Sequence, residues 1–318
     1  CDHLSRIPTD GVMLGNVLYI NCLDQAAVLA DAMGDTEKAQ SYREAAATAR
    51  EAWNEFFIDP DTGKTKNTKG EIQDTQASYA TPLRFHVVSD ENLEKVLENY
   101  NASIAEASGE DSDGMPIVPY TLTTGFNATG NLLNALSDYG LNDTAYKLFE
   151  STDYASWLYP VTQGATSIWE RWNSYTVEGG FNGNNSMNSF NHFSLGAISE
   201  WMMSYQLGIT REDGQAGYKS FVLQPTVGGT FTYANGSYES NYGTIESGWT
   251  AKDGAMETYT ATVPANTTAT LYLPISEEQA KATTAPEGAA FVEMTEHNGT
   301  ICAVYTLESG SYAFTIGA

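Results

Sequence analysis

"LGNVLYINCLDQAAVLADAMGDTEKAQSYREAAATAREAWNEFF", residues 14–57, decides how the first part of the chain folds. In its second half, Ala, Tyr, Trp and Phe recur at steps of three and four residues, which is the period of one face of an α-helix. Only the residues GDT separate a predicted helix at 14–33 from a second one at 37–57. Because so short a link turns the chain back on itself, the stretch predicts an antiparallel helical hairpin.

The same arrangement recurs at residues 74–88 and 91–107, which predict a second hairpin. Ser89 or Asp90 is a plausible N-cap for its second helix, because both side chains accept hydrogen bonds from free backbone N–H groups.

A further pair of helices is predicted at residues 127–139 and 144–152. Gly140 is expected to take the left-handed conformation that ends a helix, and Asp143 to cap the next one. A last helix is predicted at about residues 190–207, ending at Gly208. Three or four hairpins with long Gly, Asn and Asp-rich loops favour part of a toroid of helical hairpins over a compact four-helix bundle.

The texture of the sequence changes at residues 211–218. From there the chain consists of short alternating runs rich in Thr, Tyr and Val, punctuated by Gly and Pro, which indicate β-strands. Asn298-Gly299 between two such runs predicts a hairpin turn. We therefore predict a helical domain at residues 1–212 and an antiparallel β-sandwich domain at residues 213–318.

Charge limits the partners of this chain. Its formal net charge is −25, from 40 Asp and Glu against 15 Lys and Arg. Such a surface repels anions, which argues against nucleic acid and against an anionic membrane as partners. No run approaches the roughly 18 consecutive apolar residues of a membrane span, so no transmembrane helix is predicted. We expect neutral or cationic partners.

The cysteines and acids predict neither a metal site nor a disulfide framework. Cys1, Cys22 and Cys302 lie far apart and fit no CxxC or Cys/His ligand spacing. Residues 59–71 depart from the calcium-loop pattern and favour a simple turn. No cofactor is therefore expected. The first residues lack the pattern of a signal peptide, so localisation, cytoplasmic or secreted, stays open.

One carboxylate stands out in "VTQGATSIWERWNS", residues 161–174, because Glu170 is the only acid between Tyr154 and Val177. The surrounding loop is rich in aromatic residues, whose faces stack on sugar rings, while a carboxylate can activate water at an anomeric carbon. The other interpretation is structural: Glu170 pairs with Arg171 or Arg84, and the aromatic residues belong to a core.

A resemblance favours the first interpretation. "YASWLYPVTQGATSIWERWNS" and the following "SMNSFNHFSLGAISEW" resemble the second half of the catalytic domain of bacterial α-L-rhamnosidases, glycoside hydrolase family 78. "TGFNATGNLLNAL" is similar to the family segment that precedes these two motifs. The run at residues 237–274, "SYESNYGTIESGWTAKDGAMETYTATVPANTTATLYLP", is similar to the family's terminal β-sandwich. The resemblance covers nearly the whole chain. It implies an (α/α)6 toroid and hydrolysis of terminal α-L-rhamnosides with inversion of configuration.

The resemblance also assigns residues. Glu170 matches the general base, which deprotonates the attacking water, and His192 matches a histidine that binds sugar hydroxyls. Trp169 and Trp172 flank the base, and they complete the expected substrate-binding set together with Trp157 and Asn191.

One part of the family pattern is missing. Inverting hydrolysis needs a second carboxylate roughly 6.5–9.5 Å from the first, acting as general acid. The family's acid motif, Asp-x4-Glu-x6-Asp, is absent, and the opening CDHLSRIP resembles a point downstream of it, with His3 at a position usually held by Trp. Asp74, Asp113 and Glu178 are weak substitutes. We expect a chain that starts inside the catalytic domain, holds the base but lacks the acid, and associates with the remaining part or with itself.

Two alternatives remain open at this point. The chain could be a non-catalytic fragment that only holds carbohydrate, or another inverting glycosidase on the same toroid. A purely structural interaction protein fits the polar, aromatic loop least well.

Overall fold

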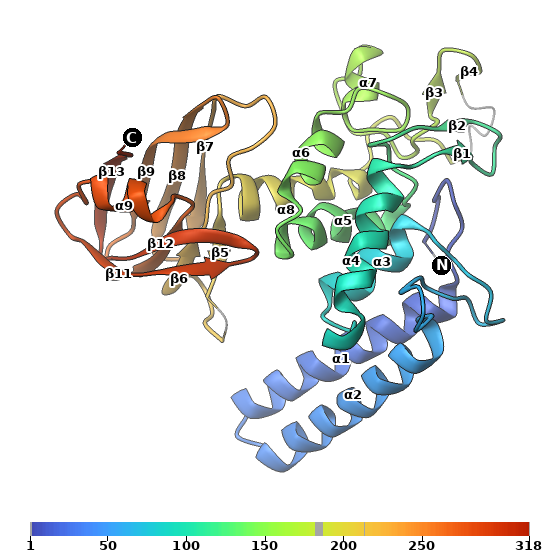
Figure 1. Cartoon of the computed structure of the whole chain (residues 1–318), viewed down its shortest axis with the longest axis horizontal. Helices are drawn as coiled ribbons and strands as arrows, with labels where there is room; N and C mark the ends of the chain where they lie inside the picture. The colour runs from blue at the N-terminus through green and yellow to red at the C-terminus, as the bar shows by residue number, and fades with distance from the viewer. Residues whose placement is uncertain (1, 182–186, 213, 318) are drawn as a thin grey trace. The chain divides into compact units, whose positions relative to one another are not determined.

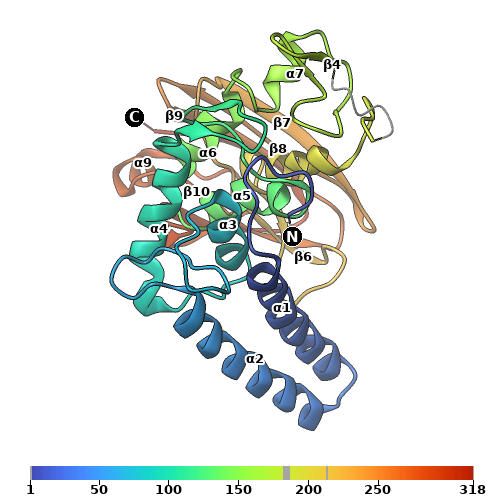
Figure 2. The ribbon, with the colours of Figure 1, turned by 90° about the vertical axis from the view of Figure 1, so that its right-hand side faces the viewer.

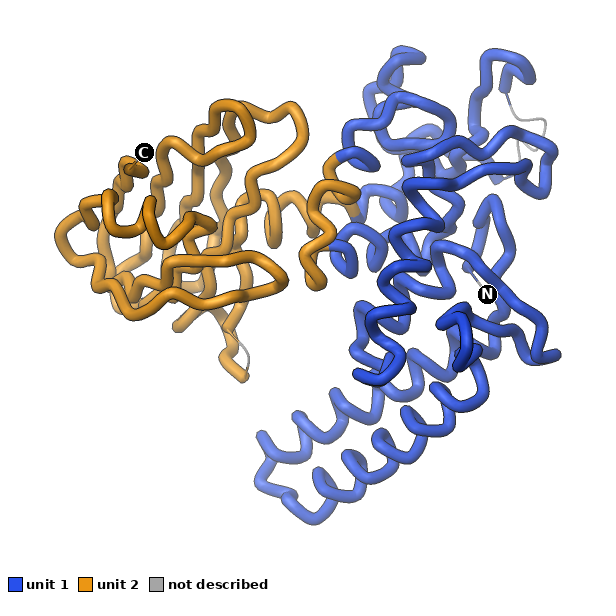
Figure 3. The backbone as a smooth tube through the Cα atoms, in the orientation of Figure 1, with its two compact units in different colours: residues 1–136, 147–197 blue, residues 137–146, 198–318 orange. Residues whose placement is uncertain are grey.

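The computed structural model describes residues 2–181, 187–212 and 214–317. The chain consists of two compact units, one at residues 1–136 and 147–197 and the other at residues 137–146 and 198–318 (Figure 3). The predicted domain boundary at residue 212 stays a prediction.

The first half of the chain is helical (Figure 1). Its helices are, in order, α1 (Gly11–Ala32), α2 (Thr36–Phe57), α3 (Gln76–Arg84), α4 (Asp90–Ala105), α5 (Phe126–Asp138), α6 (Asn142–Glu150) and α7 (Leu158–Thr162). The loops carry two short antiparallel strand pairs, β1 (Gly109–Glu110) with β2 (Pro116–Ile117) and β3 (Tyr175–Thr176) with β4 (Gly180–Phe181).

The predicted hairpin at residues 14–57 is confirmed, since α1 and α2 lie side by side in both views (Figures 1 and 2). Arg50 of α2 forms an ion pair with Asp24 of α1 at 2.7 Å, and Arg43 pairs with Asp31. α1 is long and apolar enough to cross a membrane by length and composition, in the part of the chain that could be searched. That is weak evidence for a span, because the core helix of a soluble protein passes the same test.

The second hairpin is also confirmed, and its first helix is almost entirely buried. Gln76 at the start of α3 donates to the Thr121 carbonyl at 2.8 Å and accepts the Thr123 N–H at 2.9 Å. These bonds attach α3 to the segment that leads into α5. Ser89 occupies the N-cap position of α4, but its side chain does not accept the expected capping bond from the backbone.

Three boundaries need correction or confirmation. Gly140 has the predicted left-handed conformation after α5, with a φ of 75°. Gly34, after α1, has the same conformation, with a φ of 78°. Asp143 does not precede its helix, because α6 already begins at Asn142 and Asp143 lies in the first turn. The last helical stretch begins near residue 194 rather than 190. It runs through η1 (Ser194–Ala197), α8 (Ile198–Trp201) and η2 (Met202–Gln206), and ends before Gly208, as predicted.

The rest of the chain forms two sheets (Figure 1). One has the strand order β11-β12-β10-β6-β5, and the other β13-β9-β8-β7. The strands are β5 (Ile209–Arg211), β6 (Ser220–Leu223), β7 (Tyr233–Ser240), β8 (Gly243–Lys252), β9 (Ala255–Val263), β10 (Thr268–Leu273), β11 (Ala289–His297), β12 (Thr300–Leu307) and β13 (Gly310–Thr315), with helix α9 (Glu277–Ala282) before β11.

The sandwich is antiparallel as predicted, with one exception: β6 and β10 pair in parallel. The turn at Asn298-Gly299 joins β11 to β12, and both residues have positive φ, as the predicted two-residue hairpin requires. Apolar side chains from both sheets, among them Phe221, Trp249 and Tyr305, form one buried core.

Candidate active site

The two motif segments of the long loop lie against each other in the first unit. The Glu170 N–H donates to the Ser189 carbonyl at 2.9 Å, and the His192 N–H donates to the Ile168 carbonyl at 2.8 Å. The Ser167 hydroxyl adds a bond to the carbonyl of Phe190 at 2.5 Å. The structure therefore brings together Glu170 and His192, the two residues for which the sequence predicts the main polar roles.

Glu170 is a buried carboxylate, with 8% of its surface exposed. Its Oε2 accepts the Ser189 N–H at 2.7 Å. Within residues 2–181, 187–212 and 214–317 its Oε1 accepts no hydrogen bond, and the side chain forms no ion pair. The Arg171 side chain instead donates from Nε to the Met187 carbonyl at 2.7 Å. The ion pair with Arg171 or Arg84 that the structural interpretation requires is therefore not found among the described residues, whereas its other part, the burial of aromatic side chains, holds for Trp157, Trp169 and Trp172.

His192 is half-buried and oriented by its neighbours. Its Nδ1 accepts the Ser194 N–H at 3.3 Å. The ring stacks on Phe126 and on Phe193, with centroid distances of 5.0 and 5.1 Å. Because Nδ1 accepts, Nε2 carries the proton in the neutral imidazole, and this N–H is a donor suited to a hydroxyl oxygen.

The tryptophans hold the loop in place. The Trp157 indole donates to the Leu195 carbonyl and the Trp172 indole to the Thr124 carbonyl, each at 2.8 Å. The two rings meet edge to face at 5.9 Å. Both side chains and that of Trp169 are buried. The indole N–H groups of Trp157 and Trp172 are therefore used by the protein itself and are not available to a ligand.

A pocket of about 310 Å³ lies beside these rings and is lined mostly by apolar side chains, including all three tryptophans. Glu170 is not among its lining residues, although its neighbours Trp169 and Arg171 are. Asn191 is exposed, and among the described residues its only hydrogen bonds are those of its backbone with the Ser189 hydroxyl, at 3.1 Å.

Burial raises the pKa of Tyr154 and of Tyr159 in the same loop, and for Tyr154 the Arg6 guanidinium opposes this effect in part. Both side chains are therefore neutral phenols at neutral pH. They contribute hydroxyl groups and ring faces rather than negative charge. Glu170 is therefore the only source of negative charge among the side chains of residues 154–177.

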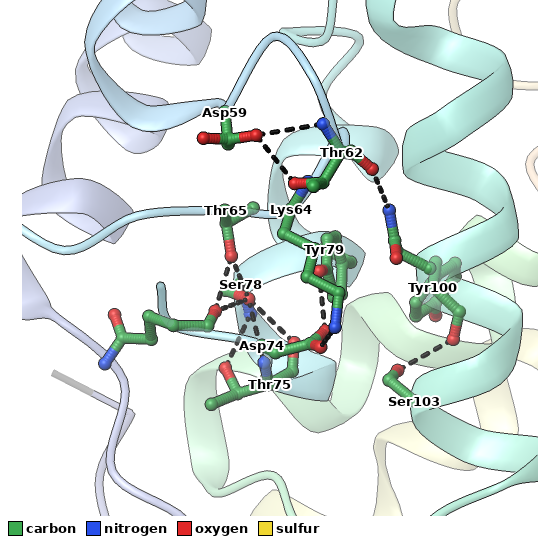
Figure 4. A network of polar contacts seen from close by, with 12 residues as sticks. Asp59, Thr62, Lys64, Thr65, Asp74, Thr75, Ser78, Tyr79, Tyr100 and Ser103 are labelled. Atoms are coloured by element: carbon green, nitrogen blue, oxygen red, sulfur yellow. Dashed lines mark hydrogen bonds and ion pairs between the residues drawn. The ribbon is translucent and has the colours of Figure 1, made fainter. Parts of the chain in front are cut away.

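The alternative acids are engaged as acceptors or fully exposed. Asp74 pairs with Lys64 and accepts the Tyr79 hydroxyl at 2.6 Å (Figure 4). Asp113 is exposed and accepts the side-chain amide of Asn173 at 2.9 Å. Glu178 is exposed. A general acid has to offer a proton, whereas the contacts of Asp74 and Asp113 use the carboxylate as an acceptor.

Sequence reasoning missed Asp2. Its carboxylate accepts the backbone N–H groups of Gly125, Asn127 and Ala128 at 2.6 to 3.0 Å and so caps α5, close to the ring of Phe126. Burial raises the pKa of Asp2, and these hydrogen bonds oppose the rise. No local pattern could reveal this cap, because the helix begins more than a hundred residues later in the chain.

No group of three or more His, Cys, Asp or Glu that could hold a metal ion occurs within the described residues. The turn expected at residues 59–71 is present, with Asp59 accepting the Thr62 N–H at 2.9 Å.

Helical hairpins that carry a buried carboxylate in an aromatic loop, followed by a β-sandwich, define a glycoside hydrolase of the six-hairpin class. More particularly, the chain belongs to the bacterial α-L-rhamnosidase family. Residues 3–205 match the bacterial alpha-L-rhamnosidase 6 hairpin glycosidase domain, and residues 208–286 match the bacterial alpha-L-rhamnosidase C-terminal domain. The fold class and family expected from the sequence are thereby confirmed.

Its relatives are much longer than this chain. An α-L-rhamnosidase of Streptomyces avermitilis is 32% identical over 96% of this chain and 26% of its own length. One of Formosa agariphila is 33% identical over 85% of this chain and 27% of its own. The crystal structure of the S. avermitilis α-L-rhamnosidase complexed with L-rhamnose matches 99% of this chain and 28% of that chain, with a TM-score of 0.82 and 30% identity. The chain thus spans about a quarter of the length of these relatives.

Proposed function

We propose that this chain forms the general-base side of an active site that hydrolyses terminal α-L-rhamnosides with inversion of configuration. The observation that carries the proposal is the state of Glu170: a buried carboxylate that forms no ion pair with any described residue and is anchored through Oε2 by the Ser189 N–H. Anchoring one oxygen leaves Oε1 to accept a proton from a water molecule that attacks the anomeric carbon. The relative of known structure that binds L-rhamnose supports the choice of sugar.

In this proposal His192 binds a sugar hydroxyl through Nε2, and Asn191 offers a free side-chain amide. Trp157, Trp169 and Trp172 form the apolar wall of the neighbouring pocket, which Glu170 itself does not line but which its neighbours Trp169 and Arg171 do. We propose that none of Asp74, Asp113 and Glu178 is the general acid, because the described contacts of Asp74 and Asp113 use the carboxylate as an acceptor and Glu178 is exposed. No cofactor is expected, because the displacement needs only water: a water oxygen bonds to the anomeric carbon as the glycosidic C–O bond breaks, the base takes a proton from this water, and a general acid gives one to the leaving oxygen.

The dependence of rate on the leaving group tests this division of roles. A 2,4-dinitrophenolate leaves without protonation, whereas methanol needs a general acid. We therefore expect this chain to hydrolyse 2,4-dinitrophenyl α-L-rhamnoside measurably and methyl α-L-rhamnoside not at all. Proton NMR of the first product should show β-L-rhamnose, the inverted anomer.

The matched pair of variants is Glu170→Gln and Glu178→Gln, because both remove one carboxylate from the same loop and Glu178 is exposed. Loss of the base should lower turnover by roughly 10²–10⁴, while Glu178→Gln should leave it unchanged. Equal turnover in both variants would remove Glu170 from the mechanism. Rhamnose binding that survives Glu170→Gln without any turnover in the parent chain would instead identify a non-catalytic carbohydrate-binding fragment.

We also propose a partner for α1. Apolar side chains on this helix remain exposed, including Val28 at 56% and Leu29 at 65%. Exposed apolar surface of this kind is typical of an interface. We expect this face to associate with the remaining part of such a catalytic domain or with a second copy, which light scattering after gel filtration would detect as an increase in mass.

A further inference from the structure

The second unit contains a pocket of about 330 Å³, made only of residues from this unit. We call it the amide pocket, after the four side-chain amides that line it together with Tyr205 and Pro225: Asn142, Gln224, Gln279 and Asn298. Its volume falls at the lower end of the ~300–1,000 Å³ typical of small-molecule sites. Glu170 belongs to the other unit, so the pocket is not part of the candidate active site.

The amide pocket is uncharged. None of its lining residues, all of which are described, is Asp, Glu, Lys, Arg or His. This differs from the chain as a whole, in which 17% of residues are charged and the net charge is −25. A charged ligand would lose its hydration on entering without gaining a partner of opposite charge, so the lining selects for neutral molecules.

One hydrogen-bond acceptor of a lining residue lacks a partner. Asn142 Oδ1 is shielded from solvent and accepts no hydrogen bond from residues 2–181, 187–212 or 214–317. Buried polar atoms of folded proteins are nearly always paired, so an unpaired one calls for an explanation. Asn142 lines the pocket, and rotation of its side-chain amide about χ2 would turn Oδ1 from its shielded position toward a ligand hydroxyl, which is a neutral donor.

Two of the other amides, Gln224 and Asn298, are held in fixed positions. Gln224 Oε1 contacts His297 Nδ1 at 2.8 Å and accepts the Asn298 amide at 3.2 Å, and Gln224 Nε2 donates to the His297 carbonyl at 3.3 Å. Asn298 belongs to the tight turn between β11 and β12. Groups that are fixed before binding lose little freedom when a ligand arrives, which is the usual property of a built site.

Apolar side chains complete the lining, namely Tyr205, Pro225, Met256 and Pro274. The pocket thus combines apolar faces with paired amide donors and acceptors and has no charge. A sugar ring presents the same combination, since its C–H groups form an apolar face and its neighbouring hydroxyls each donate and accept.

We propose that the amide pocket binds a neutral pyranose, and that Asn142 Oδ1 accepts a hydrogen bond from one of the sugar hydroxyls. This gives the C-terminal unit a carbohydrate-binding function of its own. The proposal does not depend on Glu170 and would hold for an inactive chain as well.

The test is titration of the chain with methyl α-L-rhamnoside, methyl α-D-glucoside and methyl α-D-glucuronide, followed by saturation-transfer NMR. At least one of the two neutral glycosides should bind, and the charged glucuronide should bind about tenfold more weakly or not at all. Binding of neither neutral glycoside, or equal binding of the glucuronide, would overturn the proposal.

Two changes locate the site. Ala255→Trp fills the pocket at the exposed first residue of β9, and Ala290→Trp is its matched control on the exposed edge strand β11, away from the pocket. Asn142→Leu removes the unpaired acceptor at nearly constant volume. We expect Ala255→Trp and Asn142→Leu each to weaken binding by about tenfold or more, and Ala290→Trp to bind like the parent. The same affinity in Asn142→Leu as in the parent would overturn the proposal even if Ala255→Trp failed to fold.

Glu170→Gln separates this site from the proposed active site. Sugar binding that survives this change but is lost in Asn142→Leu supports the amide pocket, whether or not the chain has activity. Binding that is lost in Glu170→Gln and kept in Asn142→Leu assigns it to the first unit and overturns the proposal.

Discussion

Arg6 and Asp111 form an ion pair inside the first unit, with side chains 4% and 1% exposed and 2.7 Å between Nε and Oδ2. Arg6 also donates to the Pro116 carbonyl at 2.8 Å, and its guanidinium lies 4.5 Å from the centre of the Tyr154 ring. Asp111 Oδ1 accepts the Met115 N–H at 2.8 Å. The pair therefore fastens the N-terminal segment to the loop after α4 and to the aromatic loop of the candidate site.

Removing one member of this pair should destabilise the fold. Arg6→Met leaves the Asp111 carboxylate buried without its cation, and breaking a buried pair in this way costs about 3–5 kcal/mol of unfolding free energy. Urea denaturation would measure it. The double variant Arg6→Met/Asp111→Leu removes both charges and should recover part of the loss. A single variant as stable as the parent would mean that water reaches the pair.

The two described cysteines should differ in reactivity. Cys22 is exposed on α1, whereas Cys302 is buried in the sandwich, where burial raises the pKa of its thiol to about 12. Because the thiolate is the reactive form, iodoacetamide at pH 8 should modify Cys22 rapidly and Cys302 only after unfolding. Peptide mass spectrometry would distinguish them. Rapid modification of Cys302 in the native protein would contradict its place in the core.

At the scale of single elements, Asp10 illustrates how a cap responds to pH. It accepts the N–H groups of Val12 and Met13 at the start of α1, and also the N–H and hydroxyl of Thr68. Partial desolvation raises the pKa of Asp10, but these hydrogen bonds together outweigh it and lower the pKa to about 2. A lowered folded-state pKa means that the ionised cap stabilises the fold above pH 4, and that this contribution disappears as the pH falls from about 4 to 2.

Asp10→Asn is the matching variant, because asparagine also caps helices but does not titrate. The difference in thermal midpoint between the parent and this variant should be largest near pH 6 and should shrink between about pH 4 and pH 2. A difference that stays constant over this range would show that ionisation of Asp10 does not contribute.

Local patterns predicted the elements whose stability is local. The hairpin at residues 14–57 was predictable because periodicity and a short link lie within one stretch of sequence. The start of the last helix was not, because the His192 N–H donates to the Ile168 carbonyl instead of to a residue one helical turn earlier. The parallel pairing of β6 with β10 escaped prediction for the same reason, since register between distant strands leaves no local trace.

The residues of the candidate site likewise fall into those that could be predicted from the sequence and those that could not. Glu170 was recognisable as a single acid in an aromatic stretch, and the resemblance to a family added His192. Asp2 and the Arg6–Asp111 pair were not recognisable, because their partners lie more than a hundred positions away along the chain. Residues that hold a site together through distant contacts follow from the fold and not from the motif.

At the scale of the whole molecule, net charge dominates. If every Lys and Arg paired with a different acid, 40 − 15 = 25 carboxylates would still lack a cation. The ion pairs that do form between α1 and α2 are partly exposed and therefore contribute little. Repulsion between the remaining acids should outweigh these attractions and destabilise the compact state.

Salt should therefore stabilise this protein. Screening shortens the range of charge interactions to about 10 Å at 0.1 M ionic strength, and it weakens repulsion spread over the surface more than it weakens the buried Arg6–Asp111 pair. The thermal midpoint at pH 7 should rise between about 10 mM and 500 mM NaCl, with most of the rise at the low end. Near the sequence pI of 4.2 the net charge vanishes, and so should the salt effect. The same series with sodium sulfate separates charge screening from the exclusion of sulfate from the protein surface, which also stabilises folded proteins. At pH 4.2 the net charge is absent, so any remaining rise in the thermal midpoint comes from exclusion. A midpoint that falls with added NaCl at pH 7 would mean that specific ion pairs, and not net charge, control the stability of the chain.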